Sequence, residues 1–155
     1  MTTDAFTIAG KMALPYQYFA GATSSRCIVA LRDEKKILAS RCERSDRTVF
    51  PPRQVCDLTF EDLSDNWVEV SDRGTITGFT IIRYAEPYQP MAPPYVLALI
   101  RLDGSDATLT HIVHSEDIET VAIGQRVNAV FAETPVNNIL AIRHFCCVPT
   151  DSDSP

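Results

Sequence analysis

The apolar side chains that follow Leu14-Pro15 fall roughly at helical spacing. No proline interrupts the stretch 16–39, whose apolar positions include Phe19, Ala22, Cys27, Ala30 and Leu31. This pattern predicts an N-terminal helix, with Ser24 or Ser25 as the cap of a second piece and the charged run 32–36 as its last turn. Because its apolar stripe would lie outside the main core, the helix would fold back or dock on a partner.

The pattern becomes short and broken between residues 37 and 64. Two small strands are expected at 37–40 and 48–50, on either side of the turn 44–47. Pro51 and Pro52 fix their own φ angles and restrict the residues before them, so the chain should be extended there. A single turn is expected at 60–63. This stretch therefore predicts a small β unit of its own.

From residue 66 onward the chain is rich in β-branched and aromatic residues. The first strand is expected over 66–84, broken at the turn signal 72–74 into the pieces 66–70 and 75–84. Four more strands are expected at 95–102, 107–114, 125–133 and 139–145. The segment Asp103-Gly104-Ser105-Asp106 is a hairpin signal, and Ser115 can cap a helical turn over 115–119. A short helical element between the third and fourth of five strands is the order of an OB-fold, a small partly open barrel. The alternative is a generic small barrel or sandwich.

These elements predict a mainly β fold in four parts. We expect an N-terminal helical segment over 1–36, a small ribbon over 37–64, a five-stranded OB-fold barrel over 65–147 and a flexible tail over 148–155.

Composition narrows the class of protein. The chain has 155 residues, of which 45% are hydrophobic, enough for one domain with a core that needs no metal or disulfide. Neither a signal peptide nor an apolar membrane span is recognised in the sequence. The five cysteines are odd in number and include the vicinal pair Cys146-Cys147. We therefore expect a cytoplasmic protein with reduced thiols.

Charge is distributed unevenly. The net charge is −6, which argues against a surface that binds duplex nucleic acid throughout. Residues 26–56 carry eight bases and four acids, whereas residues 57–155 carry five bases and fifteen acids. A basic segment on an acidic body suggests local contact with an anion. The alternative is a solvated helix end and loop.

Two cysteines have the spacing of half a zinc site. Cys42 and Cys56 flank the small hairpin, and the partner position of a C-x-x-C knuckle is Ser45 for the first and Thr59 for the second. Structural zinc requires four converging donors, usually thiolates or imidazoles, and hydroxyls rarely serve. The spacing of a zinc site is retained, but two of its four positions carry hydroxyls in place of thiols, so we expect no bound zinc.

Several segments, taken in order, resemble a known family. The most specific are Val49-Phe50-Pro51-Pro52-Arg53-(x2)-Cys56 and Gly74-Thr75-Ile76-(x2)-Phe79-Thr80. Further agreement comes from Arg41-Cys42, Trp67-Val68-Glu69-Val70, Pro93-Pro94-Tyr95-Val96, Leu102-Asp103-Gly104-Ser105, His111 and Gly124-Gln125-Arg126-Val127. Over residues 14–147 the chain resembles the acyl-CoA-associated OB-fold proteins, in which a rubredoxin-like zinc ribbon precedes an OB-fold.

The resemblance implies a non-catalytic partner of an enzyme. Members of this family accompany thiolases, hydroxymethylglutaryl-CoA-synthase-like enzymes, or steroid side-chain hydratases and aldolases, and help to hold the CoA thioester. It therefore implies a hetero-oligomer with a thiolase-like subunit and a shared CoA thioester ligand, with benzoylsuccinyl-CoA thiolysis as one setting. Ser45 and Thr59 depart from the family pattern and put its zinc in doubt.

Candidate CoA contacts cluster around the two prolines. Arg53 follows them on a stiff backbone, and a guanidinium matches phosphate oxygens with a bidentate fork. The full set that we expect to contact CoA comprises Arg53, Arg41, Arg44, Pro52, Phe50 and Thr80. Support could come from Arg47, Lys35 or Lys36. The alternative for Arg53 is a surface side chain that packs on Trp67 or Phe50.

No catalytic residues are recognised. His111 and His114 are three apart in an expected strand, so they should point to opposite faces. Asp103 and Asp106 suit a turn better than an acid/base pair. Phosphate-binding glycine loops are missing as well. Two alternatives to the accessory role remain, a single-strand nucleic-acid binder built on the OB-fold and an enzyme in its own right.

Overall fold

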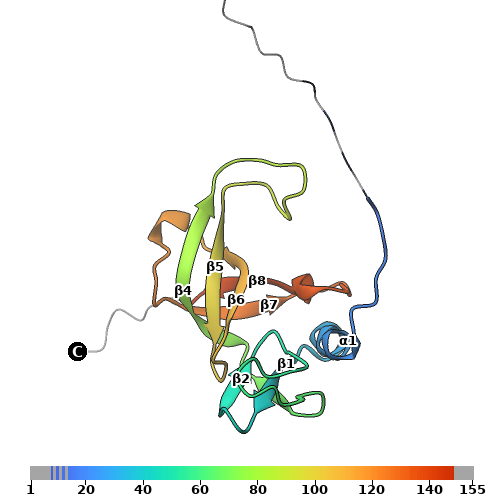
Figure 1. Ribbon diagram of the computed structural model, residues 1–155. Coiled ribbons are helices and arrows are strands. Elements are labelled where there is room, and N and C mark those ends of the chain that lie inside the picture. Colours follow the sequence, from blue (N-terminus) through green and yellow to red (C-terminus); the bar gives the residue numbers. More distant parts are fainter. Residues whose placement is uncertain (1–7, 9, 11, 13, 149–155) are drawn as a thin grey trace, which may run out of the picture.

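Five strands close into a barrel. The computed structural model describes residues 8, 10, 12 and 14–148. The barrel strands are β4 (Arg73–Ile82), β5 (Tyr95–Leu102), β6 (Thr108–His114), β7 (Arg126–Phe131) and β8 (Ile142–Cys147), in the closed order β4-β5-β6-β8-β7 (Figure 1). Strands β6 and β8 run parallel, and the other neighbours run antiparallel. This arrangement confirms the mainly β prediction and is that of an OB-fold.

A second, three-stranded sheet lies at one end of the barrel (Figure 1). It consists of β1 (Ile37–Cys42), β2 (Arg47–Val49) and β3 (Trp67–Val70) in the order β2-β1-β3. We expected β3 to begin the barrel, but it pairs with β1 instead. Alternating apolar residues indicate a strand without indicating its partner, and only residues 71 and 72 separate β3 from β4. The predicted domain boundary between residues 64 and 65 therefore separates β3 from β1 and β2, the other strands of its own sheet.

The N-terminal helix is shorter than predicted. It comprises α1 (Ala22–Val29) and a π-helical turn, η1 (Ala30–Glu34), while residues 14–20 form no helix. Gly21 has φ 84 and precedes the first helical residue, so a glycine, rather than Ser24 or Ser25, sets the start. The helix ends within the charged run 32–36 that was predicted to close it, at Lys35 with φ 58. In the described part of the chain, no helix is long and apolar enough to cross a membrane.

One core serves the helix, the small sheet and the barrel. Leu31 from the helix and Phe50 from the loop after β2 belong to the same buried cluster as the barrel residues Ile100, Val127 and Phe145. All five side chains are at most 1% exposed. The helix therefore folds back onto the core, which is one of the two alternatives predicted from the sequence. The expected parts 1–36, 37–64 and 65–147 share a hydrophobic interior.

Two short helical turns differ from the expected elements. The turn after β6 is η2 (Ile118–Thr120), and its cap is Asp117 rather than the predicted Ser115. The Asp117 carboxylate accepts from the backbone N–H of Glu119. A second turn, η3 (Ile139–Ala141), takes the first residues of the last expected strand, so β8 begins at Ile142. Asn138 caps it by accepting from the Leu140 N–H. Aspartate and asparagine decide where these two turns begin, because their side chains accept hydrogen bonds from free backbone N–H groups. Of the predicted tail over 148–155, the structure describes Val148, whose N–H donates to the Arg126 carbonyl oxygen at 2.9 Å, and the rest lies outside the described residues.

Candidate functional site

The four knuckle positions converge at the end of the small sheet. Cys42 Sγ lies 3.3 Å from Thr59 Oγ1, and Ser45 Oγ lies 3.6 Å from Cys56 Sγ. Both thiols are buried. The spacing seen in the sequence therefore corresponds to a real meeting of two loops, one after β1 and one between β2 and β3.

The side chains that meet there do not fit a structural zinc ion. Besides the two thiols and two hydroxyls, Glu61 places Oε2 3.3 Å from Cys42 Sγ, the distance of an S–H···O hydrogen bond. Within the described ranges, no group of three or more His, Cys, Asp or Glu side chains is arranged to hold a metal. Structural zinc takes four thiolate or imidazole donors. Hydrogen bonds join the two loops where a metal would otherwise do so.

The knuckle changes the acidity of Cys56. Hydrogen bonds from the Thr59 hydroxyl, then the Leu58 backbone and then Ser45 lower the pKa of this thiol from 9.0 to about 6. By contrast, burial raises the pKa of Cys27, in helix α1, to about 12. A thiol that is hydrogen-bonded in its charged form becomes a thiolate near neutral pH, whereas a thiol in apolar surroundings stays neutral.

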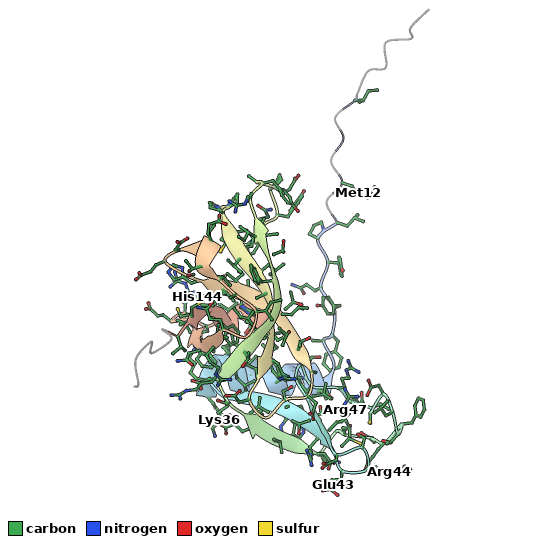
Figure 2. All side chains as sticks on the ribbon, turned by 90° about the vertical axis from the view of Figure 1, so that its left-hand side faces the viewer. Met12, Lys36, Glu43, Arg44, Arg47 and His144 are labelled. Carbon is green, nitrogen blue, oxygen red and sulfur yellow. The ribbon has the colours of Figure 1, made fainter. Side chains whose placement is uncertain are left out.

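The predicted CoA-binding arginines lie on the small sheet, and most are already paired. Arg41 forms an ion pair with Asp46. Arg53 lies 2.9 Å from Asp57, which also accepts from Arg47 at 3.4 Å. Among the described residues, Arg44 has no ion-pair partner, and it projects at the far end of the small sheet (Figure 2). Since exposed ion pairs are weak, a phosphate group could replace the carboxylates.

The other predicted contacts are dispersed. Phe50 is 1% exposed, so it is a core residue and offers no surface to a ligand. The reason is that the following prolines turn the chain and leave the phenyl ring inside. Pro52 lines a shallow hollow with Cys27 and Thr108, and Thr80 lies exposed on β4. The indole of Trp67 is covered by Arg26, at 4.7 Å from its ring centroid, rather than by Arg53.

A larger cavity, of about 580 Å³, opens on the barrel. It lies between β6, β8, the turn η2 and the loop before β5, and contains two histidines, with the His114 and His144 rings 5.4 Å apart between centroids. His111 is buried on the opposite face of β6, as its spacing from His114 predicted. His144 was not singled out in the sequence, because only the parallel pairing of β6 with β8 brings it to His114.

Large apolar side chains are exposed in the segment before α1 and at the knuckle, as well as in the loop between β4 and β5. In the segment before α1, Tyr16, Tyr18 and Phe19 are 78%, 79% and 85% exposed, and this segment runs away from the body of the molecule (Figure 1). At the knuckle, Leu58 and Phe60 are 60% and 83% exposed. Such large exposed aromatic side chains commonly mark interaction surfaces.

The fold is an OB-fold barrel with an attached ribbon-like sheet. Residues 67–132 match the family described as the C-terminal OB-fold domain of ChsH2. A scaffold protein from Methanocaldococcus jannaschii, described as containing a DUF35 domain, is 25% identical over 101 residues, which make up 65% of this chain and 71% of that protein. The barrel is therefore similar to the OB-fold domains of these DUF35 and ChsH2 proteins.

Solved structures share the fold at low identity. A DUF35-family protein of unknown function from Sulfolobus solfataricus is 24% identical, with a TM-score of 0.59 over 71% of this chain and 78% of that chain. A chain of the structure described as the Ltp2-ChsH2(DUF35) aldolase is 18% identical, with a TM-score of 0.62 over 79% of this chain and 93% of that chain. These likenesses concern the fold.

Proposed function

We propose that this chain is a non-catalytic accessory subunit of an enzyme complex that processes acyl-CoA, and that its partner is a thiolase-type enzyme. The match of residues 67–132 to the ChsH2 C-terminal domain carries the proposal. The name of the archaeal relative, a scaffold protein, and the presence of a chain of this fold in an aldolase structure are in keeping with it.

The polar groups of the barrel also favour a supporting role. Ser115, the hydroxyl beside the paired histidines, donates to the Asp117 carbonyl oxygen at 2.9 Å rather than to an imidazole. His111 is buried, and burial lowers its pKa. A nucleophile needs a base within hydrogen-bond reach, and the pairs of this kind among the described residues, Cys42 with Glu61 and Ser64 with Asp62, do not line the barrel cavity. The chemistry would then reside on the partner.

The exposed apolar surfaces before α1 and at the knuckle are the proposed contacts with the partner. The segment 14–20 has no charged residue and presents Tyr16, Tyr18 and Phe19 almost fully to solvent. Aromatic side chains of this kind supply most of the binding energy in many protein interfaces. Phe60 at the knuckle would provide a second anchor, at the end of the molecule where the arginines lie.

For the CoA thioester, we propose the arginine face formed by Arg41, Arg44 and Arg53. The phosphates of CoA would take the place of the carboxylates of Asp46 and Asp57. Arg44 is already free for this among the described residues. The chain would thus hold one end of the substrate while the partner acts on the acyl group.

Co-expression with a thiolase of the same organism tests the partner. We expect a stoichiometric complex in size-exclusion chromatography with light scattering. The triple variant Tyr16→Ala, Tyr18→Ala, Phe19→Ala should lose it while its melting temperature stays unchanged. The matched control replaces Tyr84 and Tyr88, two exposed tyrosines of the barrel loop, and should keep the complex. A chain that remains monomeric with every thiolase tried would refute the role.

A second measurement tests the CoA face within that complex. The KM of the partner for its acyl-CoA should rise about tenfold in Arg44→Gln, because a charge-assisted contact with phosphate contributes about 1.5–3 kcal/mol. Arg101→Gln, on an exposed barrel position, is the control. Tight binding of a labelled oligonucleotide at low salt, with no effect of the variant on KM, would favour the nucleic-acid alternative instead.

A further inference from the structure

The barrel cavity has the size of a small-molecule site. Its volume of about 580 Å³ lies within the range of about 300–1,000 Å³ that is usual for ligand pockets. The floor is formed by buried residues of β5 and β6, Tyr95, Ile112 and Val113. Because these belong to the closed barrel, the floor is rigid.

The basic side chains of the cavity are one arginine and two histidines, Arg143 and His144 from β8 and His114 from β6. Burial, and then the neighbouring His114 and Arg143, lower the pKa of His144, so the positive charge at this site comes from Arg143. Within residues 14–148, the guanidinium of Arg143 has no carboxylate partner, and the lining includes no aspartate or glutamate. An unpaired guanidinium beside two imidazoles is a ready donor set for an anion.

The rest of the lining is largely apolar. It is formed by the loop before β5, the turn η2 and the turn η3, through the residues Pro90, Met91, Pro94, Ile118 and Leu140. Met91 is 42% exposed, an unusual position for a thioether, and methionine adapts its shape to varied apolar ligands. A molecule that complements both parts of this lining must carry a negative charge and an apolar body.

We propose that this cavity binds a small organic carboxylate with an aromatic or branched apolar body. The carboxylate accepts from Arg143 and from an imidazole N–H of His114 or His144. The body lies against Met91, Pro94 and Leu140. His144 lies on the barrel, well away from Arg44 and Arg47 at the end of the small sheet (Figure 2). The site is therefore separate from the arginine face and goes beyond the proposed accessory role.

Titration calorimetry of the isolated full chain with 2-naphthoate tests the proposal. We expect saturable binding, weakened about tenfold or more in Arg143→Gln, as loss of a charge-assisted hydrogen bond implies. Arg101→Gln, which removes another exposed barrel arginine outside the cavity, should leave the affinity unchanged. NMR shifts of the His114 and His144 ring protons should move with saturation in the unmodified chain.

Two further ligands test the proposal on the unmodified chain. The uncharged isostere 2-naphthalenemethanol should bind at least about tenfold more weakly, and inorganic phosphate should not displace 2-naphthoate. The proposal is overturned if 2-naphthoate does not saturate the protein, or if Arg143→Gln binds as the unmodified chain does. Equal binding of the alcohol would reveal an apolar hollow, and displacement by phosphate an ion site, and either would overturn it. Each of these outcomes is independent of whether a thiolase partner is found.

Discussion

Thr48 in the small sheet and Asp106 in the barrel exchange two hydrogen bonds. The Thr48 N–H donates to Asp106 Oδ2 at 2.8 Å, and the Asp106 N–H donates to the Thr48 carbonyl oxygen at 2.7 Å. Beside them, the Phe50 N–H donates to Ser105 Oγ at 3.3 Å. The hairpin turn between β5 and β6 therefore does more than reverse the chain, because it holds the end of β2 and satisfies backbone groups that would otherwise be buried without partners.

Removing the Asp106 carboxylate should weaken the whole fold. In Asp106→Ala the part-buried Thr48 N–H loses its acceptor, and we expect the free energy of unfolding to fall by about 1–3 kcal/mol. Urea denaturation measures the change as a shift of the midpoint at constant slope. Asp106→Asn keeps an acceptor oxygen and should lose less. If the alanine and asparagine variants were equally destabilised, the charge rather than the hydrogen bond would be responsible.

Gly74 in β4 is expected to tolerate no side chain. A Cβ at this position would lie 2.7 Å from the Arg101 carbonyl oxygen and 2.9 Å from Ile100 Cγ2. Gly74→Ala should therefore destabilise the barrel by about 1–3 kcal/mol, the usual effect of overpacking. Gly78→Ala, in the same strand, meets only Leu99 Cδ1 at 3.6 Å and serves as the matched control. A thermal melt of Gly74→Ala that coincides with that of Gly78→Ala would contradict the steric argument.

The knuckle should regain zinc when its thiols are restored. Because the positions 42, 45, 56 and 59 already converge, we expect Ser45→Cys with Thr59→Cys to bind about one zinc ion per chain and to raise the melting temperature. Elemental analysis after dialysis measures the metal. The variant Ser45→Ala with Thr59→Ala should bind none and should be less stable. Failure of the four-cysteine variant to take up zinc would mean that the loops have drifted from tetrahedral geometry.

The low pKa of Cys56 predicts a pH-dependent contribution to stability. Its pKa is about 6 in the folded chain, against 9.0 as the ordinary value, so the folded state favours the thiolate. This contribution is complete above the unfolded pKa and is lost as the pH falls through about 6. The loss of stability in Cys56→Ser should therefore be larger at about pH 8 than at about pH 6.

A matched thiol provides the control for this prediction. The pKa of Cys27 is raised to about 12 by burial, so this thiol is neutral in both folded and unfolded chains below pH 9. The effect of Cys27→Ala on the free energy of unfolding should be the same at both pH values. A pH-independent effect of Cys56→Ser would show that its thiol is not ionised.

Much of the barrel could be predicted because local signals agree there. The strand over 95–102 has both ends where expected, since a nearly continuous run of apolar residues ends at the turn 103–106. The helix was extended too far because its apolar spacing outweighed Gly21, whose positive φ sets the true start. The partner of β3 could not be inferred, because pairing with β1 depends on long-range packing and not on any signal within residues 67–70.

The same division applies to the sites. The knuckle positions could be found because zinc ribbons have a fixed local spacing, and Ser45 and Thr59 occupy it. The buried position of Phe50 could not, because flanking prolines indicate an extended chain without telling which side faces inward. Arg143 and His144 follow one another in β8, and nothing local connects them with His114, thirty residues earlier. Only closure of the barrel assembles that cavity.

The two-residue step from β3 to β4 has a mechanical consequence. Ser71 and Asp72 are the whole connection, and the Ser71 N–H donates to the Asp103 carbonyl oxygen at 3.1 Å. With the core shared as well, the small sheet has no hinge about which to swing. A partner bound at the knuckle would therefore fix the orientation of the barrel as well. The chain would act as a rigid connector rather than a flexible one.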